Sequence, residues 1–308
     1  MKPQIVSMLG ISLRGMLMGI ADLIPGVSGG TMALITGIYP RLVDAIAAFG
    51  PETLMLFLRG RITEFWRRVD GGFLLSLMMG IGFSVLVFAR LLAYLLSTVP
   101  HLVWALFLGL IIASVLHLFR EIRHWRPQVV VAIVAGAAIA WWLTHLPAFG
   151  LSPTPLVIAV CGMIAICAWI LPGISGSFIL LVLGLYEYVI GSIKAFDVEV
   201  LLSFMVGAAG GLLLFTRVLK WALSNFYSTI MGVLTGFLIG SLHLLWPWQL
   251  SLPGSTKAGG VPVMPADWTA QTGMEADIAV CIALTIVGLV GVLALEFAGR
   301  QGQGEPNG

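Results

Sequence analysis

Two stretches, IADLIPGVSGGTMALITGIYPRLVDAI at residues 20–46 and CAWILPGISGSFILLVLGLYEYVIGSI at residues 167–193, share a pattern of proline, glycine and serine within apolar sequence. They align without a gap at an offset of 147 residues, which places Pro25 opposite Pro172 and Ser28 opposite Ser175. Proline lacks a backbone N–H and neighbouring glycines weaken a helix, so neither stretch is expected to continue as one straight helix. The sequence therefore predicts a broken helix, a re-entrant hairpin, in each half of the chain.

The composition places the chain among membrane proteins. Of 308 residues, 59% are apolar and only 10% are charged, which is typical of a polytopic membrane protein rather than a soluble domain. A net charge of +2 gives no indication of nucleic-acid binding. The five histidines and three cysteines lack the spacing of metal ligands, so the sequence predicts neither a metal site nor a cofactor.

The first half of the chain, residues 1–146, is predicted to contain one hairpin, one charged loop and three spanning helices. The loop is rich in arginine, so we expect it on the cytoplasmic side with a short interfacial helix around Trp66. The predicted bounds are 8–38 for the hairpin, 40–70 for the loop, and 72–99, 102–119 and 129–146 for the spans.

The second half, residues 156–298, is predicted to repeat this plan without the charged loop. At an offset of 127 residues, 73–114 overlays 200–241 and Arg90 lies opposite Arg217. A polar stretch at 247–276 precedes the last span, and a polar tail at 299–308 is expected to be disordered. The predicted bounds are 156–193 for the hairpin, 200–223, 229–246 and 278–297 for the spans, and 224–228 for a short turn.

Two arguments give the orientation. Three crossings in each half make the second half inverted relative to the first, as in many secondary transporters. Placing 40–70, 120–127, 224–228 and the C-terminus in the cytoplasm puts nearly all lysines and arginines inside, with the acidic loops 194–199 and 247–277 outside. The predicted fold class is an all-α polytopic membrane protein built from two inverted repeats, with both termini cytoplasmic.

Arg90 and Arg217 are the most informative single residues. A charge inside a span costs ~2.5–3.5 kcal/mol on insertion scales, so such residues usually face a cavity or a partner. Arg217, with Lys220 nearby, could instead extend to the inner interface, whereas Arg90 approaches the outer interface against the positive-inside bias. Together the two arginines indicate capture of an anion, and a guanidinium suits phosphate particularly well.

The hairpin turns supply further donors for an anion. Pro25, Gly26, Pro172 and Gly173 are expected to form the turns themselves. Glycine allows close approach of a ligand, and hydroxyls add donors. A close-packed helix crossing that needs glycine for fit is the alternative, but two copies joined to two arginines favour a binding site. The predicted phosphate-binding residues beside the arginines are Ser28, Gly29, Gly30, Thr31, Ser175, Gly176 and Ser177.

Two acids lie within or beside the hairpins, Asp22 and Glu187. Either could accept the proton or sodium ion that drives transport, or could simply neutralise an arginine, and the sequence leaves both readings open.

The motifs resemble those of a known family. MGIADLIPGVSGGTM at 18–32 and LPGISGSF at 171–178 are similar to the paired motifs of the PopT-type polyprenyl-phosphate translocases, long classified as a bacterial membrane domain of unknown function. The resemblance covers nearly the whole chain. It implies a flippase, not an enzyme, that returns undecaprenyl phosphate from the outer to the inner leaflet of the bacterial cytoplasmic membrane for carrier-lipid recycling and cell-wall synthesis. We expect alternating access, with the phosphate head bound by protein and the apolar tail left in the bilayer.

Two other functions remain open. Polyprenyl-diphosphate phosphatases also carry an intramembrane Pro-Gly-x-Ser turn, but their chemistry is expected to use an arginine next to the serine and a glutamate cluster. Here Gly29 and Gly176 follow the serines, which disfavours hydrolysis. A carrier for small anions or ions is the second alternative, since broken helices also build ion sites. The sequence leaves open the coupling ion, the tail-length selectivity and whether the chain forms a homodimer.

Overall fold

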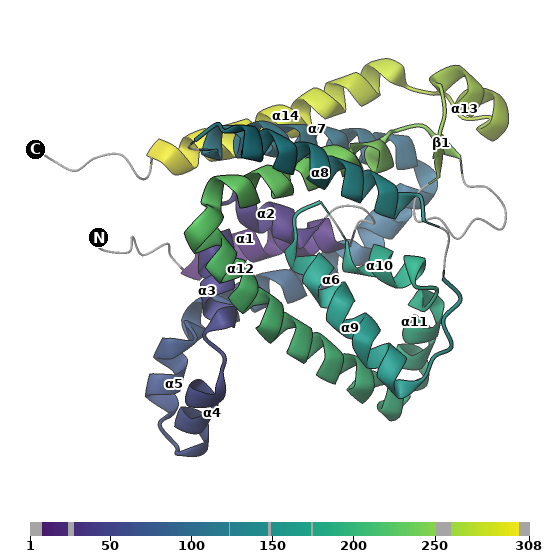
Figure 1. Ribbon diagram of the computed structural model, residues 1–308. Helices are drawn as coiled ribbons and strands as arrows, with labels where there is room; N and C mark the ends of the chain where they lie inside the picture. Colours follow the sequence, from purple (N-terminus) through teal and green to yellow (C-terminus); the bar gives the residue numbers. More distant parts are fainter. Residues whose placement is uncertain are drawn as a thin grey trace, which may run out of the picture.

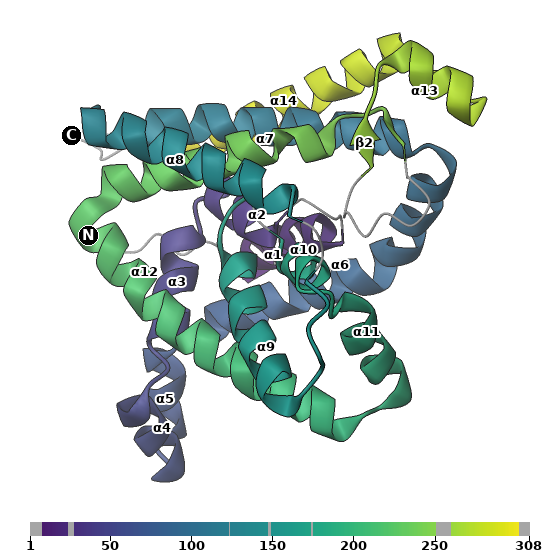
Figure 2. The ribbon, with the colours of Figure 1, turned by 45° about the vertical axis from the view of Figure 1, so that its right-hand side comes forward.

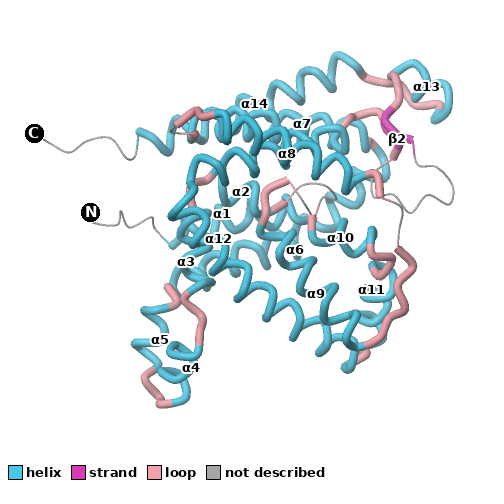
Figure 3. The backbone as a smooth tube through the Cα atoms, in the orientation of Figure 1, coloured by secondary structure: helices cyan, strands magenta, loops and turns pink. Residues whose placement is uncertain are grey.

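The computed structural model describes residues 8–23, 28–122, 124–146, 149–173, 175–250 and 260–301, without the side chains of residue 194 and residues 295–301. Pro25, Gly26 and the last part of the predicted tail, 302–308, lie outside the described residues. The fold is helical throughout apart from one short pair of strands, as Figure 3 shows for the described chain. The predicted all-α membrane class is confirmed at this level.

The first predicted hairpin is broken as expected. It consists of α1 (Met8–Asp22) and α2 (Gly29–Ile35), which pack against each other. A second break follows at Gly37, whose φ of +73° is a conformation that favours glycine, and α3 (Tyr39–Ala47) begins directly afterwards. The predicted loop at 40–70 therefore starts as a helix.

The second hairpin has the same arrangement of three helices. α9 (Pro155–Ile170) packs on α10 (Gly176–Val182), and Gly184, with φ of +74°, separates α10 from α11 (Tyr186–Ala195). α10 and α11 are bent by 116° relative to each other. The sequence predicted one break in the range 156–193, and the structure has two, because the second glycine permits a left-handed turn that ends α10.

The charged loop is more helical than predicted. α5 (Ile62–Arg68) contains Trp66, in agreement with the expected short helix, but α3 and α4 (Pro51–Leu58) precede it. Figures 1 and 2 both show α4 and α5 projecting away from the rest of the molecule. An exposed ion pair between Arg68 and Glu52, at 2.5 Å, joins α5 to α4, and a second exposed pair between Arg61 and Glu64, at 2.5 Å, lies at the start of α5.

Long apolar helices form the remainder. They are α6 (Gly71–Thr98), α7 (Pro100–Glu121), α8 (Pro127–Thr144), α12 (Val198–Ser241) with the 3-10 turn η1 (Leu242–Leu245), and α14 (Ile278–Gln301). Within the described chain, α6, α7, α8 and the α12–η1 run are long and apolar enough to cross a membrane, and the bent α10–α11 pair would be a fifth span. Outward side chains such as Leu86, 82% exposed, suit a lipid environment.

The two spans predicted at 200–223 and 229–246 both lie in α12, which consists of two helices separated by non-helical backbone at Phe226, with φ −133° and ψ 40°. This break falls inside the predicted turn at 224–228. One other boundary needs correction. The last helix continues to Gln301, so residues 299–301 of the predicted disordered tail are helical. The apolar part of α14 that is described, Ile278–Ala294, is shorter than a full span.

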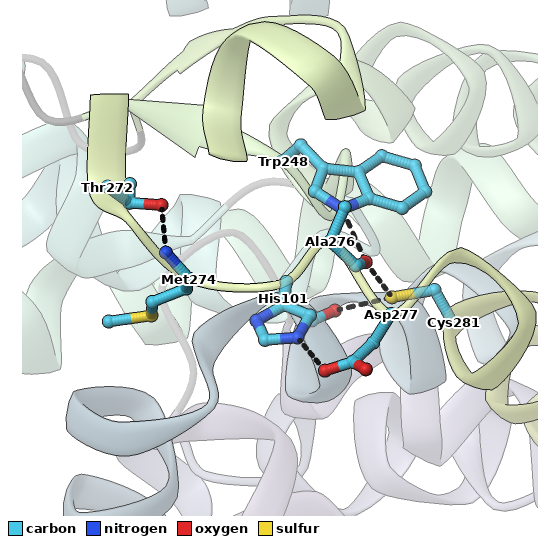
Figure 4. Close-up of polar contacts among 7 residues, drawn as sticks. All are labelled: His101, Trp248, Thr272, Met274, Ala276, Asp277 and Cys281. Carbon is cyan, nitrogen blue, oxygen red and sulfur yellow. Dashed lines mark hydrogen bonds and ion pairs between the residues drawn. The ribbon is translucent and has the colours of Figure 1, made fainter. Parts of the chain in front are cut away.

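The polar stretch 247–276 contains structure that the sequence did not predict. β1 (Gln249–Leu250) pairs antiparallel with β2 (Val261–Pro262), and α13 (Pro265–Thr272) follows. Buried Trp248 donates a hydrogen bond of 2.9 Å to the carbonyl of Ala276 (Figure 4). His101 at the start of α7 lies 3.2 Å from the Asp277 carboxylate, so this small cap is attached to the ends of α7 and α14.

Glycine-lined contacts hold the helices together in four pairs. α1 packs on α6, α9 on the first part of α12, α8 on the second part of α12, and α7 on α14. A Cβ atom on Gly15 of α1 would lie 2.3 Å from the carbonyl oxygen of Leu77 in α6, so the backbones approach as closely as only glycine allows. Figures 1 and 2 place α2 and α10, the short helices that follow the first break of each hairpin, near the middle of the molecule.

Candidate functional site

The described part of the first hairpin turn, from Ser28 onward, has its hydrogen-bonding groups occupied by neighbouring residues. Ser28 caps α2, since its hydroxyl oxygen accepts a hydrogen bond of 3.1 Å from the amide of Gly30. The amide of Gly29 donates to Oδ1 of Asp22 at 2.7 Å, so the carboxylate at the end of α1 occupies the position that an anion would take on α2. Ser28 and Thr31 are buried, with 1% and 0% of their surfaces exposed.

The two hairpin turns contact each other. The hydroxyl of Ser28 donates to the carbonyl oxygen of Trp169 at 3.0 Å, and the amide of Gly173 donates to Oγ1 of Thr31 at 3.3 Å. A Cβ atom on Gly30 would lie 2.5 Å from the carbonyl oxygen of Ile170, so the turns also touch through backbone. The structure therefore brings together the two motifs that the sequence placed in one site.

Asp22 takes part in this junction. Its half-buried carboxylate accepts the hydrogen bond from Gly29, next to Ser28, which donates to the carbonyl of Trp169 in the other hairpin. Asp22 and Trp169 occupy equivalent positions in the sequence alignment of the two motifs. Glu187, by contrast, is exposed in the first turn of α11 and forms no ion pair with any residue that the structure describes.

The second hairpin turn is more open. Ser175 and Ser177 are half-buried, and their hydroxyls lie 2.7 Å apart. Thr144 at the end of α8 also faces this region, with its hydroxyl 3.0 Å from Nε2 of His243. A small pocket adjoins the turn and is lined by Ala140, Leu143, Thr144, Gly173, Ser175, Phe178 and Leu244. Ser175 and Gly173 therefore border this pocket, whereas Ser28 is buried and is not part of its lining.

The two predicted arginines lie apart from the turns. Arg217 is exposed and donates to the carbonyl of Leu213 at 3.1 Å and to the carbonyl of Phe49, just beyond α3. Lys220, one turn further, pairs with Asp44 of α3 at 2.8 Å. Arg90 is exposed on α6 and has no hydrogen bond or ion pair among the described residues. In this conformation neither guanidinium contacts the hydroxyls of the two turns, within the ranges described.

Two buried donors in the first hairpin were missed by the sequence analysis. Nη1 of Arg14 on α1 and the hydroxyl of Tyr39 at the start of α3 are enclosed and have no hydrogen-bond partner in the described part of the chain. A charged residue inside a predicted hairpin was a signal for Arg14, and Tyr39 is marked by its identity with Tyr186 at the offset of 147 residues. As for metals, no cluster of three histidine, cysteine or acidic residues suited to an ion is present among the described residues.

Comparisons with known proteins identify the family. The family model described as undecaprenyl phosphate translocase-like matches residues 18–261. A polyprenyl-phosphate transporter of Vibrio cholerae is 38% identical over 94% of this chain and 96% of its own length. One of Staphylococcus aureus is 30% identical over 76% of this chain and 85% of its own. No solved structure matches. The chain is a multi-pass membrane protein and belongs to the undecaprenyl phosphate translocase-like family.

Proposed function

We propose that this chain transports polyprenyl phosphate, specifically undecaprenyl phosphate, from the outer to the inner leaflet of the bacterial cytoplasmic membrane. The observation that carries the proposal is the junction of the two hairpin turns, at Thr31 and Gly173, in a chain of this family. A phosphate head group needs donors that replace its water, while its tail can remain in lipid. Broken helices at membrane depth are a common way to present such donors.

Matching contacts support two repeats. At the offset of 147, α1 maps onto α9 and the bounds of α2 become those of α10. Gly15 approaches the carbonyl of Leu77, and Gly162, its equivalent, approaches that of Phe204 with a Cβ distance of 2.5 Å. Leu77 and Phe204 are themselves equivalent at the offset of 127. We therefore take the halves as structural repeats, and the distribution of arginine and lysine supports their inverted orientation.

The contacts of α8 and α14, the last spanning helices of the two halves, support the same assignment. A Cβ atom on Gly109 of α7 would lie 2.0 Å from the carbonyl of Thr285 in α14, and one on its equivalent, Gly236 of α12, would lie 2.3 Å from that of Ile133 in α8. Hence α8 of the first half packs against the second half, and α14 of the second half packs against the first. This reciprocal exchange is expected of two related halves.

The unequal state of the two turns supports alternating access. The first turn is sealed by Asp22 and by the partner hairpin, whereas the second borders a pocket at Ser175. The pocket has room for only about one water molecule, so we propose that the second hairpin opens further to admit the head group, on the outer side in the orientation with both termini cytoplasmic. In the opposite state the first turn would open, and Arg90 and Arg217 would escort the phosphate on either side.

The alternatives receive less support. Membership in a transporter family disfavours the intramembrane phosphatase, and a phosphate-release assay on purified protein tests that point directly. A carrier for free anions shares the same donor chemistry, so only substrate competition separates it from a lipid transporter. Coupling to a proton or sodium ion through Asp22 or Glu187, and assembly as a homodimer, remain proposals that the same preparation can test.

The deciding experiment uses purified protein in liposomes that contain labelled undecaprenyl phosphate, and follows head-group accessibility over time. We expect transfer well above protein-free vesicles, and loss of it in the Arg90→Ala/Arg217→Ala double variant. Arg59→Ala/Arg67→Ala, which removes two exposed arginines of the charged loop, is the matched control. Transfer no faster than in empty vesicles, under imposed proton and sodium gradients as well, would contradict the proposal.

A further inference from the structure

The first hairpin contains hydrogen-bonding groups that its own fold leaves unused. Within the described residues, Nη1 of Arg14 and the hydroxyl of Tyr39 are buried without a hydrogen-bond partner, and Tyr39 is 0% exposed. In native structures about nine in ten buried polar groups or more are paired, and an unpaired group commonly indicates a water, an ion or a ligand. Arg14 as a whole is half-buried, but its Nη1 is enclosed, and an unpaired N–H of a charged group is more costly to enclose than a neutral one.

Neighbours of both groups belong to the same hydrophobic core. On α1, Arg14 lies between Ile11 and Met18, three and four residues away and therefore on the same helix face, and these two are only 3% and 0% exposed. Ile11, Met18 and Tyr39 belong to one packed cluster. A different face of α1 contacts α6 through Gly15 and Ser12. Arg14 thus lies on the face of α1 that carries buried Ile11 and Met18 rather than on the face that contacts α6.

The donors that the sequence indicated are not available in this hairpin. The amides of Gly29 and Gly30 are bound by Asp22 and Ser28, the hydroxyl of Ser28 donates to Trp169, and Thr31 accepts from Gly173. An anion that arrives at the first half in this conformation would have to displace these contacts, or use donors that are still free. Arg14 and Tyr39 are the buried donors of the hairpin that meet the second condition.

Their chemistry identifies the class of ligand. A guanidinium offers several N–H donors in one plane and a fixed positive charge, and a phenol adds one O–H donor, a combination that suits a phosphate monoester. Resting on the proposed function for the identity of the lipid, we propose that Arg14 and Tyr39 form a phosphate-binding site in the first hairpin, which takes the head group of a polyprenyl phosphate during its passage.

The proposal makes an unusual prediction about stability. Groups that stabilise the fold lower its stability when they are removed, whereas removal of an unpaired buried group is neutral or stabilising. Tyr39→Phe keeps the ring and removes only the hydroxyl, and Arg14→Met keeps much of the apolar stem and removes the charge. Without ligand, we expect both variants to unfold at the wild-type temperature or above it. With ligand, both should lose stabilisation.

The experiment compares thermal unfolding of the full chain in lipid-free detergent with and without a short-chain polyprenyl monophosphate. The corresponding polyprenol and inorganic phosphate are tested at equal concentration. We expect the monophosphate, but not the polyprenol, to raise the unfolding temperature of the wild type. Tyr39→Phe should weaken the apparent affinity roughly 10-fold, Arg14→Met should weaken it on the order of 100-fold, and Arg14→Lys should restore part of it. Tyr94→Phe and Arg67→Met alter exposed residues and should match the wild type.

The outcomes separate this site from the proposed function. Wild-type affinity in both variants, or a lower unfolding temperature without ligand, overturns the site, while transfer by the wild type in liposomes would leave the transporter assignment standing. A wild type that neither binds nor transfers polyprenyl phosphate overturns both. If inorganic phosphate stabilises the wild type equally, and loses this effect in the same variants, the site is kept but its ligand is a free phosphate rather than the lipid.

Discussion

The amide of Gly173 and the hydroxyl of Thr31, 142 residues apart in the chain, are joined by a hydrogen bond of 3.3 Å that ties one hairpin turn to the other. Because both groups are buried, the bond cannot be replaced by water without opening the junction. Any movement that exposes the first turn must therefore break this bond and the one from Ser28 to Trp169.

Thr31→Val tests this junction. Valine preserves the shape of the side chain but cannot accept a hydrogen bond, so the amide of Gly173 is left unpaired at a cost of about 1–3 kcal/mol. We expect a lower thermal unfolding temperature and altered transfer in liposomes. Thr36→Val is the control, because the Thr36 hydroxyl bonds only to carbonyls of its own helix, Met32 at 2.7 Å and Ala33 at 3.5 Å. Equal effects of the two variants would contradict a special role of Thr31.

Glycine-to-alanine substitutions test the repeat. A Cβ atom would lie 2.0 Å from the carbonyl of Ser12 at Gly80 and 1.8 Å from that of Ala159 at Gly207, two equivalent positions. We expect Gly80→Ala and Gly207→Ala each to lower the free energy of unfolding by about 1–3 kcal/mol, because helix pairs must separate.

The same helices provide the controls. Gly82 and Gly210 have open space where a Cβ atom would be added, so alanine there should be neutral or slightly stabilising through its better helix propensity. The quantity to measure is the unfolding midpoint in detergent. If alanine lowers the midpoint relative to its control at only one of the two positions, Gly80 or Gly207, the packing of the two halves is not equivalent.

Asp22→Asn separates the structural from the proposed coupling role of this acid. An asparagine oxygen can still accept the hydrogen bond from Gly29, so the unfolding midpoint should stay near that of the wild type, whereas Asp22→Ala should lose about 1–3 kcal/mol. If the carboxylate carries the coupling proton, transfer by Asp22→Asn will no longer respond to an imposed pH gradient. A response as large as in the wild type would remove Asp22 from the coupling mechanism.

Trp268→Ala tests the cap over α7 and α14. The indole is 2% exposed, donates to the carbonyl of Gln249 at 3.2 Å and packs 4.8 Å from the ring of His101. Truncation should cost about 3–5 kcal/mol of local stability, and hydrogen exchange should accelerate in β1, β2 and α13. Trp125→Ala, which removes a 55% exposed ring, should leave exchange in the cap unchanged.

Local signals predicted the breaks of the helices well. The bounds of α2 and α10 agree with the positions of the Pro-Gly-x-Ser-Gly pattern, because proline and paired glycines act on the backbone next to them. The second breaks at Gly37 and Gly184 were not predicted, although a glycine marks each of them in the sequence. The structure of the cap at 247–276 was not predicted, because it depends on the burial of Trp248 and Trp268 by residues distant in the sequence.

The candidate site was harder to anticipate. The hairpin motif indicated hydrogen-bond donors at Ser28, Gly29 and Thr31. The sequence does not show which of these donors are already bound to other groups of the protein. Asp22, six residues before Ser28, satisfies Gly29 only because the turn folds α1 back along α2. The placement of Arg217 against Phe49 likewise depends on α3, which the sequence analysis treated as loop.

The exchange of α8 and α14 between the halves has a consequence for biosynthesis. When α8 leaves the ribosome it has no packing partner, since the part of α12 that contacts it extends to Gly240. The first half of the chain therefore stays incompletely packed in the membrane while roughly another hundred residues are synthesised. This takes about 5–20 s at ordinary elongation rates. During this interval its glycine-lined helix surfaces are open to an insertase or chaperone, and a chain truncated there would be a substrate for quality control.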